Sequence, residues 1–184
     1  MVATAAAART NYTLEVDLDH LSKPTPRFDI HYSVETHNMT DAQLEFNVTS
    51  ETQPILLALA GEESLDSFYG EAGFIENLGA ATGSRVIYAE HRYFGSSMPF
   101  NDTEAFAAPF NSWLTVEQAL HDHIQLIEKV NANNTAPVIA VGGNYGGMLA
   151  SFLRMRHPDL VHGAIASSAP LLDFANGTVA DTAF

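Results

Sequence analysis

Cysteine is absent from the 184-residue sequence, and basic residues are scarce. The absence of cysteine excludes disulfide bonds, thiolate metal sites and cysteine-based catalysis in this chain. No apolar run approaches the ~18 residues that a membrane-spanning helix needs, so no membrane span is predicted. The first residues, MVATAAAAR, lack a basic n-region and do not make a convincing signal peptide.

The balance of charge is strongly acidic. The chain has 8 Lys and Arg residues against 22 Asp and Glu residues, which gives a formal net charge of −14. This charge opposes binding to nucleic acids and to anionic membranes. It fits an acidic compartment, where protonation of carboxylates relieves their repulsion, and it equally fits an ordinary solvated surface. The hydrophobic content of 46% indicates a globular chain, long enough for one domain with a core.

Glycosylation sequons are frequent. The pattern Asn-x-Ser/Thr begins at Asn11, Asn38, Asn47, Asn101, Asn133 and Asn176. Average composition would give roughly one or two such patterns by chance in a chain of this length. We therefore expect a glycoprotein of the secretory pathway, lysosomal or extracellular, although no signal peptide is evident.

The hydrophobic pattern predicts an α/β domain. Residues 12–18, 28–34 and 44–48 alternate between apolar and polar side chains, which indicates antiparallel strands. The later segments alternate strands at 54–60, 85–89, 138–141 and 161–167 with helices at 65–78, 115–130 and 148–156. Continuous apolar strands separated by helices indicate a mainly parallel sheet. We expect residues 1–11 to be a disordered lead and residues 176–184 to be a tail.

A glycine-rich turn lies at the centre of this pattern. Residues 142–147 read Gly-Gly-Asn-Tyr-Gly-Gly between a buried strand and a helix. A strand, a tight Gly-x-X-x-Gly turn and a helix form the nucleophile elbow of α/β-hydrolases. A plain phosphate-binding loop is the alternative, but the turn lacks the Lys-Ser/Thr pair of a P-loop and the spacing G-x-G-x-x-G.

The residue at the centre of the turn is Asn144. An amide nitrogen shares its lone pair with the carbonyl group and cannot replace an activated hydroxyl as nucleophile. Asparagine does tolerate positive φ better than most other non-glycine residues. The turn is therefore expected to keep its shape, with Asn144 at positive or otherwise unusual φ.

Four blocks of sequence carry a resemblance to a known family. They are EHRYFG with SMPF at residues 90–100, LTVEQAL at 114–120, GGNYGGM at 142–148 and AIASSAP at 164–170. They are similar to the segments EHRYYG-x-S-x-PF, LT-x-EQAL, GGSYGGM and A-x-ASSAP. These segments belong to the serine exopeptidases that include lysosomal Pro-X carboxypeptidase, dipeptidyl peptidase II and thymus-specific serine protease. The resemblance covers residues 12–175, the N-terminal part of such an α/β-hydrolase domain.

The resemblance implies hydrolysis of short peptides next to proline or a small residue. The sheet would be mainly parallel with antiparallel N-terminal strands, truncated after the strand that follows the elbow. The nucleophile maps to Asn144, and the oxyanion hole would use the N–H groups of Tyr145 and of Gly61 or Glu62. Ser64 stands where the family's Gly-Asn-Glu-Gly loop has its last glycine. The acid and histidine of the triad lie beyond the point where this chain stops, so hydrolysis is not expected.

Three functions remain open. The first is a catalytically inactive serine exopeptidase. The second is a pseudo-peptidase that binds short peptides, or that pairs with a second copy or an intact relative through the exposed edge of its sheet. The third is an active hydrolase of another kind, which would need a new nucleophile beside a histidine. The nearby serines are Ser96, Ser97, Ser167 and Ser168.

Other polar residues have structural interpretations. Glu90, His91 and Arg92 are expected to form a buried network beneath the site, because buried charges must be paired. The glycines Gly142, Gly143, Gly146 and Gly147 are expected to shape the turn. Glu62 and Glu63 with Asp66 fit a substrate amine or, more simply, a solvated loop. No cofactor or metal ion is predicted, because His121 and His123 are two residues apart and do not share a helix face.

Overall fold

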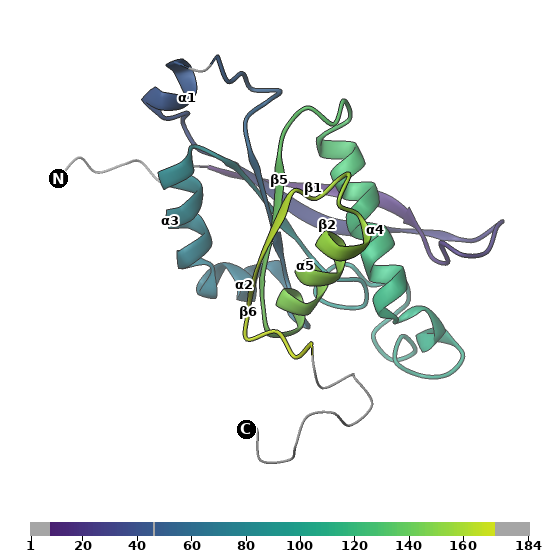
Figure 1. Cartoon of the computed structure of the whole chain (residues 1–184). Helices are drawn as coiled ribbons and strands as arrows, with labels where there is room; N and C mark the ends of the chain where they lie inside the picture. Colours follow the sequence, from purple (N-terminus) through teal and green to yellow (C-terminus); the bar gives the residue numbers. More distant parts are fainter. Residues whose placement is uncertain (1–7, 46, 172–184) are drawn as a thin grey trace.

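A mixed six-stranded sheet forms the centre of the molecule (Figure 1). The structure is a computed structural model that describes residues 8–45 and 47–171. The strands are β1 (Arg9–Asp17), β2 (Arg27–Thr36), β3 (Ile55–Leu59), β4 (Arg85–Ala89), β5 (Val138–Gly143) and β6 (Gly163–Ser167). Their order is β1-β2-β4-β3-β5-β6. β1, β2 and β4 pair antiparallel, whereas β4, β3, β5 and β6 are parallel. This is the fold class that the sequence predicts.

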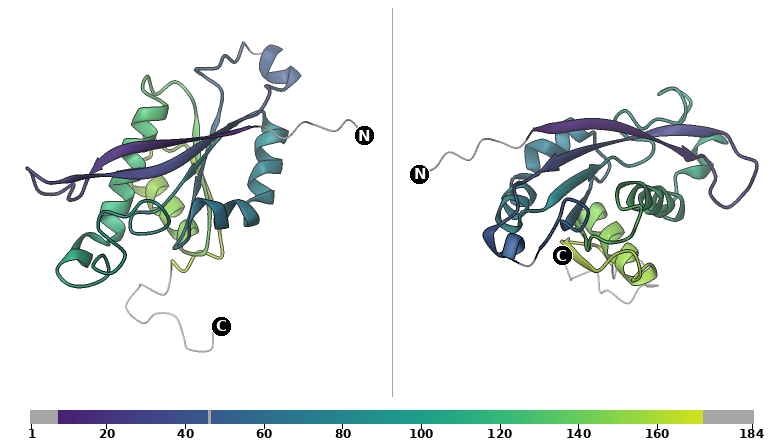
Figure 2. Two further views of the ribbon diagram at one scale, coloured as in Figure 1. Left: turned by 180° about the vertical axis from the view of Figure 1, so that it is seen from behind. Right: turned by 90° about the horizontal axis from the view of Figure 1, so that it is seen from above.

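Helices cover both faces of the sheet (Figure 2). α2 (Leu65–Glu71) and α3 (Gly73–Thr82) lie on one face, and α4 (Val116–Val130) and α5 (Asn144–Arg156) lie on the other. In β3, Leu56 and Ala58 belong to the core under α2 and α3, while Ile55, Leu57 and Leu59 belong to the core under α4 and α5. Burial on both faces explains why this strand is a continuous apolar run.

The strand predicted at residues 44–48 is wrong. Residues Asp41–Glu45 form the short helix α1 instead. Thr40 begins it with a capping box: the Gln43 N–H donates to Thr40 Oγ1 at 3.3 Å, and the Thr40 N–H donates to Gln43 Oε1 at 2.8 Å. Leu44 is exposed rather than turned toward a core. The alternating apolar residues therefore do not pack against a sheet, and the hydrogen bonds of the capping box favour the helix. Residue 46 lies outside the described residues.

Several predicted boundaries also shift. Residues 9–11, expected in the disordered lead, are the first residues of β1. The helix predicted at 65–78 is two helices, which meet at Ala72. Gly79 does not end the second helix, which continues to Thr82 and closes at Gly83 with φ of 55°. The tail at 176–184 lies outside the described residues.

Two surface features bear on the expected partners and modification. The sequon asparagines Asn11, Asn38, Asn47, Asn101 and Asn133 are all exposed, whereas Asn176 lies outside the described residues. Along β6, residues Ala164 to Ser167 are exposed, and among the described residues this strand pairs only with β5. Association through this edge stays a prediction. No helix in the part of the chain that the structure describes is long and apolar enough to cross a membrane.

Candidate active site

The turn between β5 and α5 is packed too closely for side chains at three of its glycines. A Cβ at Gly146 would lie 2.4 Å from the carbonyl oxygen of Leu59, and one at Gly142 would lie 2.3 Å from the carbonyl group of Gly146. A Cβ at Gly147 would lie 2.9 Å from the carbonyl oxygen of Gly142, whereas Gly143 has open space beside it. The start of α5 therefore contacts the sheet through its backbone, as an elbow requires.

Asn144 lies at the tip of this turn and begins α5. Its φ is 49°, which confirms the expected left-handed conformation. The side chain is exposed, and the preceding residue, Gly143, provides no side-chain cap for the helix. The elbow therefore keeps its geometry with an amide in place of a hydroxyl.

The steric difference between the two glycines on either side of Asn144 gives a matched test. We expect Gly146→Ala to lower the free energy of unfolding by about 1–3 kcal/mol or more, because the contacted atom belongs to the backbone of β3. Gly143→Ala should change it by less than about 1 kcal/mol, because its φ of −113° suits any residue. Urea unfolding of both variants measures the difference, and equal midpoints would contradict the close approach of α5 to β3.

A pocket of about 700 Å³ opens above the elbow. Asn144 and Tyr145 line it together with Gly61 and Glu62, so the predicted sources of the oxyanion-hole N–H groups share one cavity. Gly61 also lies near the start of α5, since a Cβ there would be 4.0 Å from the Gly146 nitrogen. The loop after β3 and the elbow are therefore adjacent, as the sequence predicts for the two sides of the hole.

The neighbouring loop residue Ser64 has a structural position of its own. It caps α2, and its hydroxyl oxygen accepts a hydrogen bond from the Ser67 N–H at 3.3 Å. Glu62 and Glu63 line the large pocket, but Asp66 lines a separate pocket of about 140 Å³. The three carboxylates therefore do not line one cavity, and a solvated loop remains the simpler interpretation of Asp66, which is exposed.

Among the described residues, none of the serines considered as alternative nucleophiles hydrogen-bonds to a histidine ring, although the backbone N–H of His31 donates to Ser97 Oγ at 2.8 Å. Ser97 Oγ donates to Glu90 Oε2 at 2.7 Å. Ser167 and Ser168 line the large pocket, and Ser96 lines the small one. Across residues 8–45 and 47–171, no serine hydroxyl hydrogen-bonds to a histidine ring. The structure therefore gives no support to a second Ser–His pair.

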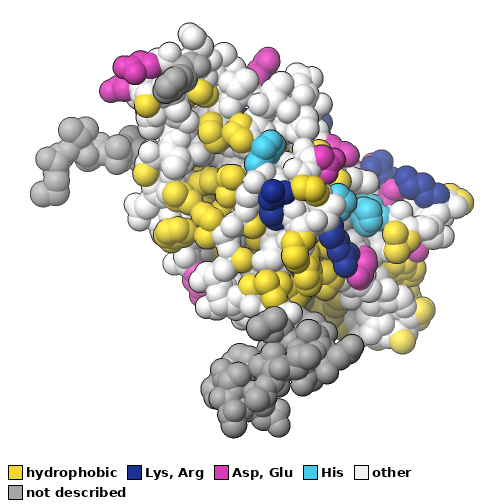
Figure 3. Space-filling model, viewed as in Figure 1, with side chains coloured by type: hydrophobic (Ala, Val, Ile, Leu, Met, Phe, Trp, Pro, Cys, Tyr) yellow, Lys and Arg dark blue, Asp and Glu magenta, His cyan; other side chains and the backbone are white. Residues whose placement is uncertain are grey.

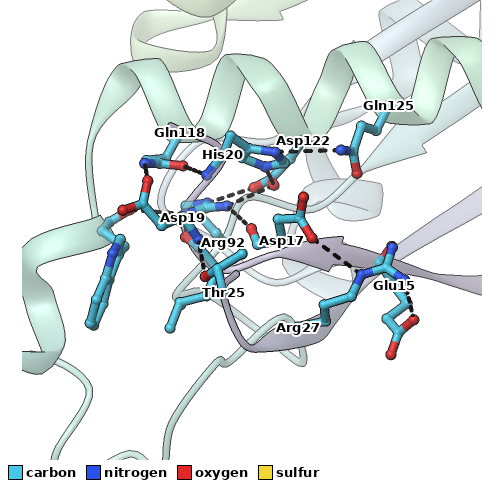
Figure 4. A network of polar contacts seen from close by, with 12 residues as sticks. Glu15, Asp17, Asp19, His20, Thr25, Arg27, Arg92, Gln118, Asp122 and Gln125 are labelled. Atoms are coloured by element: carbon cyan, nitrogen blue, oxygen red, sulfur yellow. Dashed lines mark hydrogen bonds and ion pairs between the residues drawn. The ribbon is translucent and has the colours of Figure 1, made fainter. Parts of the chain in front are cut away.

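Arg92 is the centre of the buried polar network below the site (Figure 4). Its guanidinium group forms two hydrogen bonds to the Asp122 carboxylate, at 2.6 and 2.7 Å. It also donates to the backbone carbonyls of Asp17, Leu18 and Trp113. The guanidinium thus ties the end of β1 to α4 and to the segment before that helix, as a structural ion pair would.

Glu90 belongs to this region but is not the partner of Arg92. Its carboxylate accepts hydrogen bonds from the N–H groups of Leu65 and Ser96 and from the Ser97 hydroxyl. All three residues of the expected network, Glu90, His91 and Arg92, are buried, but the Glu90 carboxylate has its own set of partners. Glu90 instead links the start of α2, which follows β3, to the loop that follows β4.

His91 holds the aromatic ring of the elbow. Its Nδ1 lies 2.6 Å from the Arg92 carbonyl oxygen, and its Nε2 lies 3.0 Å from the Tyr145 hydroxyl. A carbonyl only accepts, so Nδ1 carries the proton and Nε2 accepts from Tyr145. Burial lowers the pKa of His91 to about 4 and raises the pKa of Tyr145 to about 12, so both are neutral at pH 7. His91 therefore positions the residue next to Asn144.

The sequence pattern did not identify the importance of Asp122 and His20. His20 Nε2 lies 2.7 Å from Asp122 Oδ1, and both side chains are buried. The signal was an aspartate in the middle of an otherwise amphipathic helix, which calls for a buried partner. His121 stacks on His20 at 5.3 Å, and His123 lies in the core, so the two do not converge. No cluster of three or more potential metal ligands occurs among the described residues.

Comparisons with known proteins match the sequence to a peptidase family. The sequence model of the family described as serine carboxypeptidase S28 matches residues 43–178. The chain is 39% identical over 124 residues to lysosomal Pro-X carboxypeptidase of Homo sapiens, an alignment that covers 65% of this chain and 25% of that protein. It is 36% identical over 126 residues to thymus-specific serine protease of Homo sapiens, covering 66% and 24%. The chain thus spans about a quarter of the length of these relatives.

Solved structures share the fold at low sequence identity. A peroxisomal alpha-beta-hydrolase of Saccharomyces cerevisiae superposes with a TM-score of 0.57 at 15% identity, covering 88% of this chain and 44% of that one. An acylaminoacyl peptidase of Pyrococcus horikoshii gives 0.59 at 12% identity, covering 91% and 24%. The fold is therefore that of the α/β-hydrolases.

Proposed function

The chain belongs to the serine carboxypeptidase S28 family, and from that membership we propose that it binds short peptides above Asn144 without hydrolysing them. One observation carries this proposal: an intact elbow presents an amide, at φ of 49°, to a pocket of about 700 Å³. A pocket of this size lies within the range of ligand sites, roughly 300–1,000 Å³. The chemistry of attack is lost with the hydroxyl, while the space for a peptide is kept.

The relatives support the class of ligand. The name lysosomal Pro-X carboxypeptidase describes a peptidase that acts next to proline. Phe68 and Ile75 of the pocket wall belong to α2 and α3, and they supply apolar surface for a side chain of this kind. We propose short, proline-containing peptides as ligands of this chain, and we propose a place in the secretory pathway because the described sequon asparagines are exposed.

Turnover and binding measured side by side test this proposal. A proline-containing dipeptidyl fluorogenic substrate and a Pro-X substrate should show no turnover at pH 5 or pH 7, with a full-length active relative as positive control. The same peptides should bind saturably in isothermal titration calorimetry. Turnover abolished by a serine-directed phosphonate would overturn the proposal, because it would reveal another nucleophile. Absence of binding would overturn it as well, in favour of an inert family member.

A further inference from the structure

The two edges of the sheet differ in how they are protected. β1 forms one edge and β6 forms the other. A strand at an edge presents unpaired backbone N–H and C=O groups, and another chain can pair with them. Charged side chains along the edge are a common protection against such pairing, because a second strand would have to desolvate them.

β1 carries this protection. Arg9, Glu15 and Asp17 place three charges along the strand. Arg27 on the neighbouring strand forms ion pairs with two of them, at 2.6 Å to Glu15 and 3.4 Å to Asp17. The exposed sequon residue Asn11 lies on the same strand. A second chain would meet charged and hydrated groups along this edge.

β6 has no such protection. Residues 163–167 read Gly-Ala-Ile-Ala-Ser, without a charge or a proline. In the part of the chain that the structure describes, β6 pairs only with β5, and residues 164–167 are exposed. Figure 3 shows hydrophobic side chains gathered over α3 and the neighbouring β6 on this face. Phe74 of α3 and Ile165 of β6 line one pocket and are 61% and 37% exposed, respectively.

The sequence of β6 is self-complementary in an antiparallel pairing. If Ile165 lies opposite itself, Ala164 lies opposite Ala166 of the second copy. Gly163 then lies opposite Ser167, so every pair is uncharged and the side chains around Ile165 are small. The net charge of −14 makes two copies repel each other, which favours contact through an edge that carries no charge. A second copy of the chain therefore fits this edge.

We propose that two copies of this chain pair antiparallel through β6, about a two-fold axis at Ile165, and join their sheets into one. Both copies use the same edge, so the pair is closed and the charged β1 strands lie outermost. Ser167 and Ser168 line the pocket above Asn144, so each copy lies beside the pocket of the other. The pairing does not depend on peptide binding. One short strand from each copy makes a small interface, so the dimer is weak and depends on concentration.

Analytical ultracentrifugation of the full chain at pH 7, from about 10 μM to about 1 mM, tests the pairing. We expect the mass to rise with concentration from one copy to two, without larger species. Ile165→Lys should raise the dissociation constant at least about tenfold, because two like charges would face each other. Thr10→Lys, at an exposed position of β1, is the matched control and should leave it unchanged. Circular dichroism establishes that both variants keep the fold.

The absence of cysteine makes the register measurable with single-cysteine variants. Ile165→Cys should form a disulfide-linked dimer under mild oxidation, because opposite residues of an antiparallel pair have Cα atoms about 4.5–5.5 Å apart. Ser167→Cys should not, because its two copies would lie about 13 Å apart along the strands. Thr10→Cys, on the other edge, measures cross-linking by random collision.

Three results would overturn the inference. The first is the mass of a single copy at every concentration together with no cross-link in Ile165→Cys, as expected if a peptide or another segment of the chain covers β6. The second is equal cross-linking of the three cysteine variants. The third is a dimer that Ile165→Lys does not weaken, which would place the contact elsewhere. Peptide binding to the chain could survive each of these results.

Discussion

Replacing Asp122 with alanine is expected to lower the free energy of unfolding by about 3–5 kcal/mol. The Arg92 side chain is fully buried, and Asp122 neutralises it through two short hydrogen bonds. Without the carboxylate, a guanidinium group stays buried with only carbonyl acceptors. The loss is a large fraction of the 5–15 kcal/mol that stabilises a typical domain. Urea unfolding followed by circular dichroism at pH 7 measures it.

A matched surface pair controls for the loss of a negative charge. Glu117 and Arg156 are 4.0 Å apart and more than half exposed, so Glu117→Gln should cost no more than about 1 kcal/mol. Asp122→Asn retains the shape of the side chain and provides a second variant if the alanine variant does not fold. Similar, small losses for Asp122→Ala and Glu117→Gln would contradict the buried ion pair.

The parts of the fold that the sequence predicts correctly are those decided by neighbouring residues. The elbow could be predicted because its shape requires small residues at Gly142, Gly146 and Gly147, whatever the rest of the chain does. The positive φ of Asn144 follows from the same turn. The buried strands could be predicted because burial on both faces leaves an uninterrupted apolar run.

The errors concern interactions that depend on the tertiary structure or on competing local signals. At residues 41–45, the capping box of Thr40 and Gln43 overrides an alternating pattern that resembles a strand. Arg92 and Asp122 are 30 residues apart, and nothing in either segment identifies the other. Glu90 is two residues from Arg92 in sequence, yet its carboxylate accepts hydrogen bonds from Leu65, Ser96 and Ser97 rather than from the guanidinium group. The placement of acidic side chains in the pocket likewise depends on how α2 and α3 pack above the elbow.

Acid is expected to destabilise the folded chain well before its carboxylates are protonated. Burial lowers the pKa of both His91 and His123 to about 4, compared with 6.5 in the unfolded chain. Between pH 6.5 and pH 4 the unfolded state therefore binds more protons, and the free energy of unfolding falls as the pH falls. The full stabilisation is present above pH 6.5. Each histidine contributes a loss on the order of 3 kcal/mol by pH 4.

Substitution of His123 discriminates better than substitution of His91, because no hydrogen bond to the His123 ring is found in the described part of the chain. Its ring is fully buried, and within the described residues neither nitrogen has a hydrogen-bond partner. Among the neighbouring titratable groups, His91 and Arg92 oppose protonation of the ring, and Asp122, which the Arg92 guanidinium pairs, favours it. His123→Phe should stabilise the chain by about 1–3 kcal/mol at pH 7, because it removes a buried polar group without partners. It should also remove about half of the decline between pH 7 and pH 4.5.

Urea unfolding at pH 7 and pH 4.5 measures both effects, with His157→Gln as the control. His157 is partly exposed at the end of α5, so its loss should leave the decline nearly unchanged. A decline as steep in His123→Phe as in the parent chain would assign the acid sensitivity to other groups. If the expected decline is observed, the free energy of unfolding is larger near neutral pH than at pH 4.5.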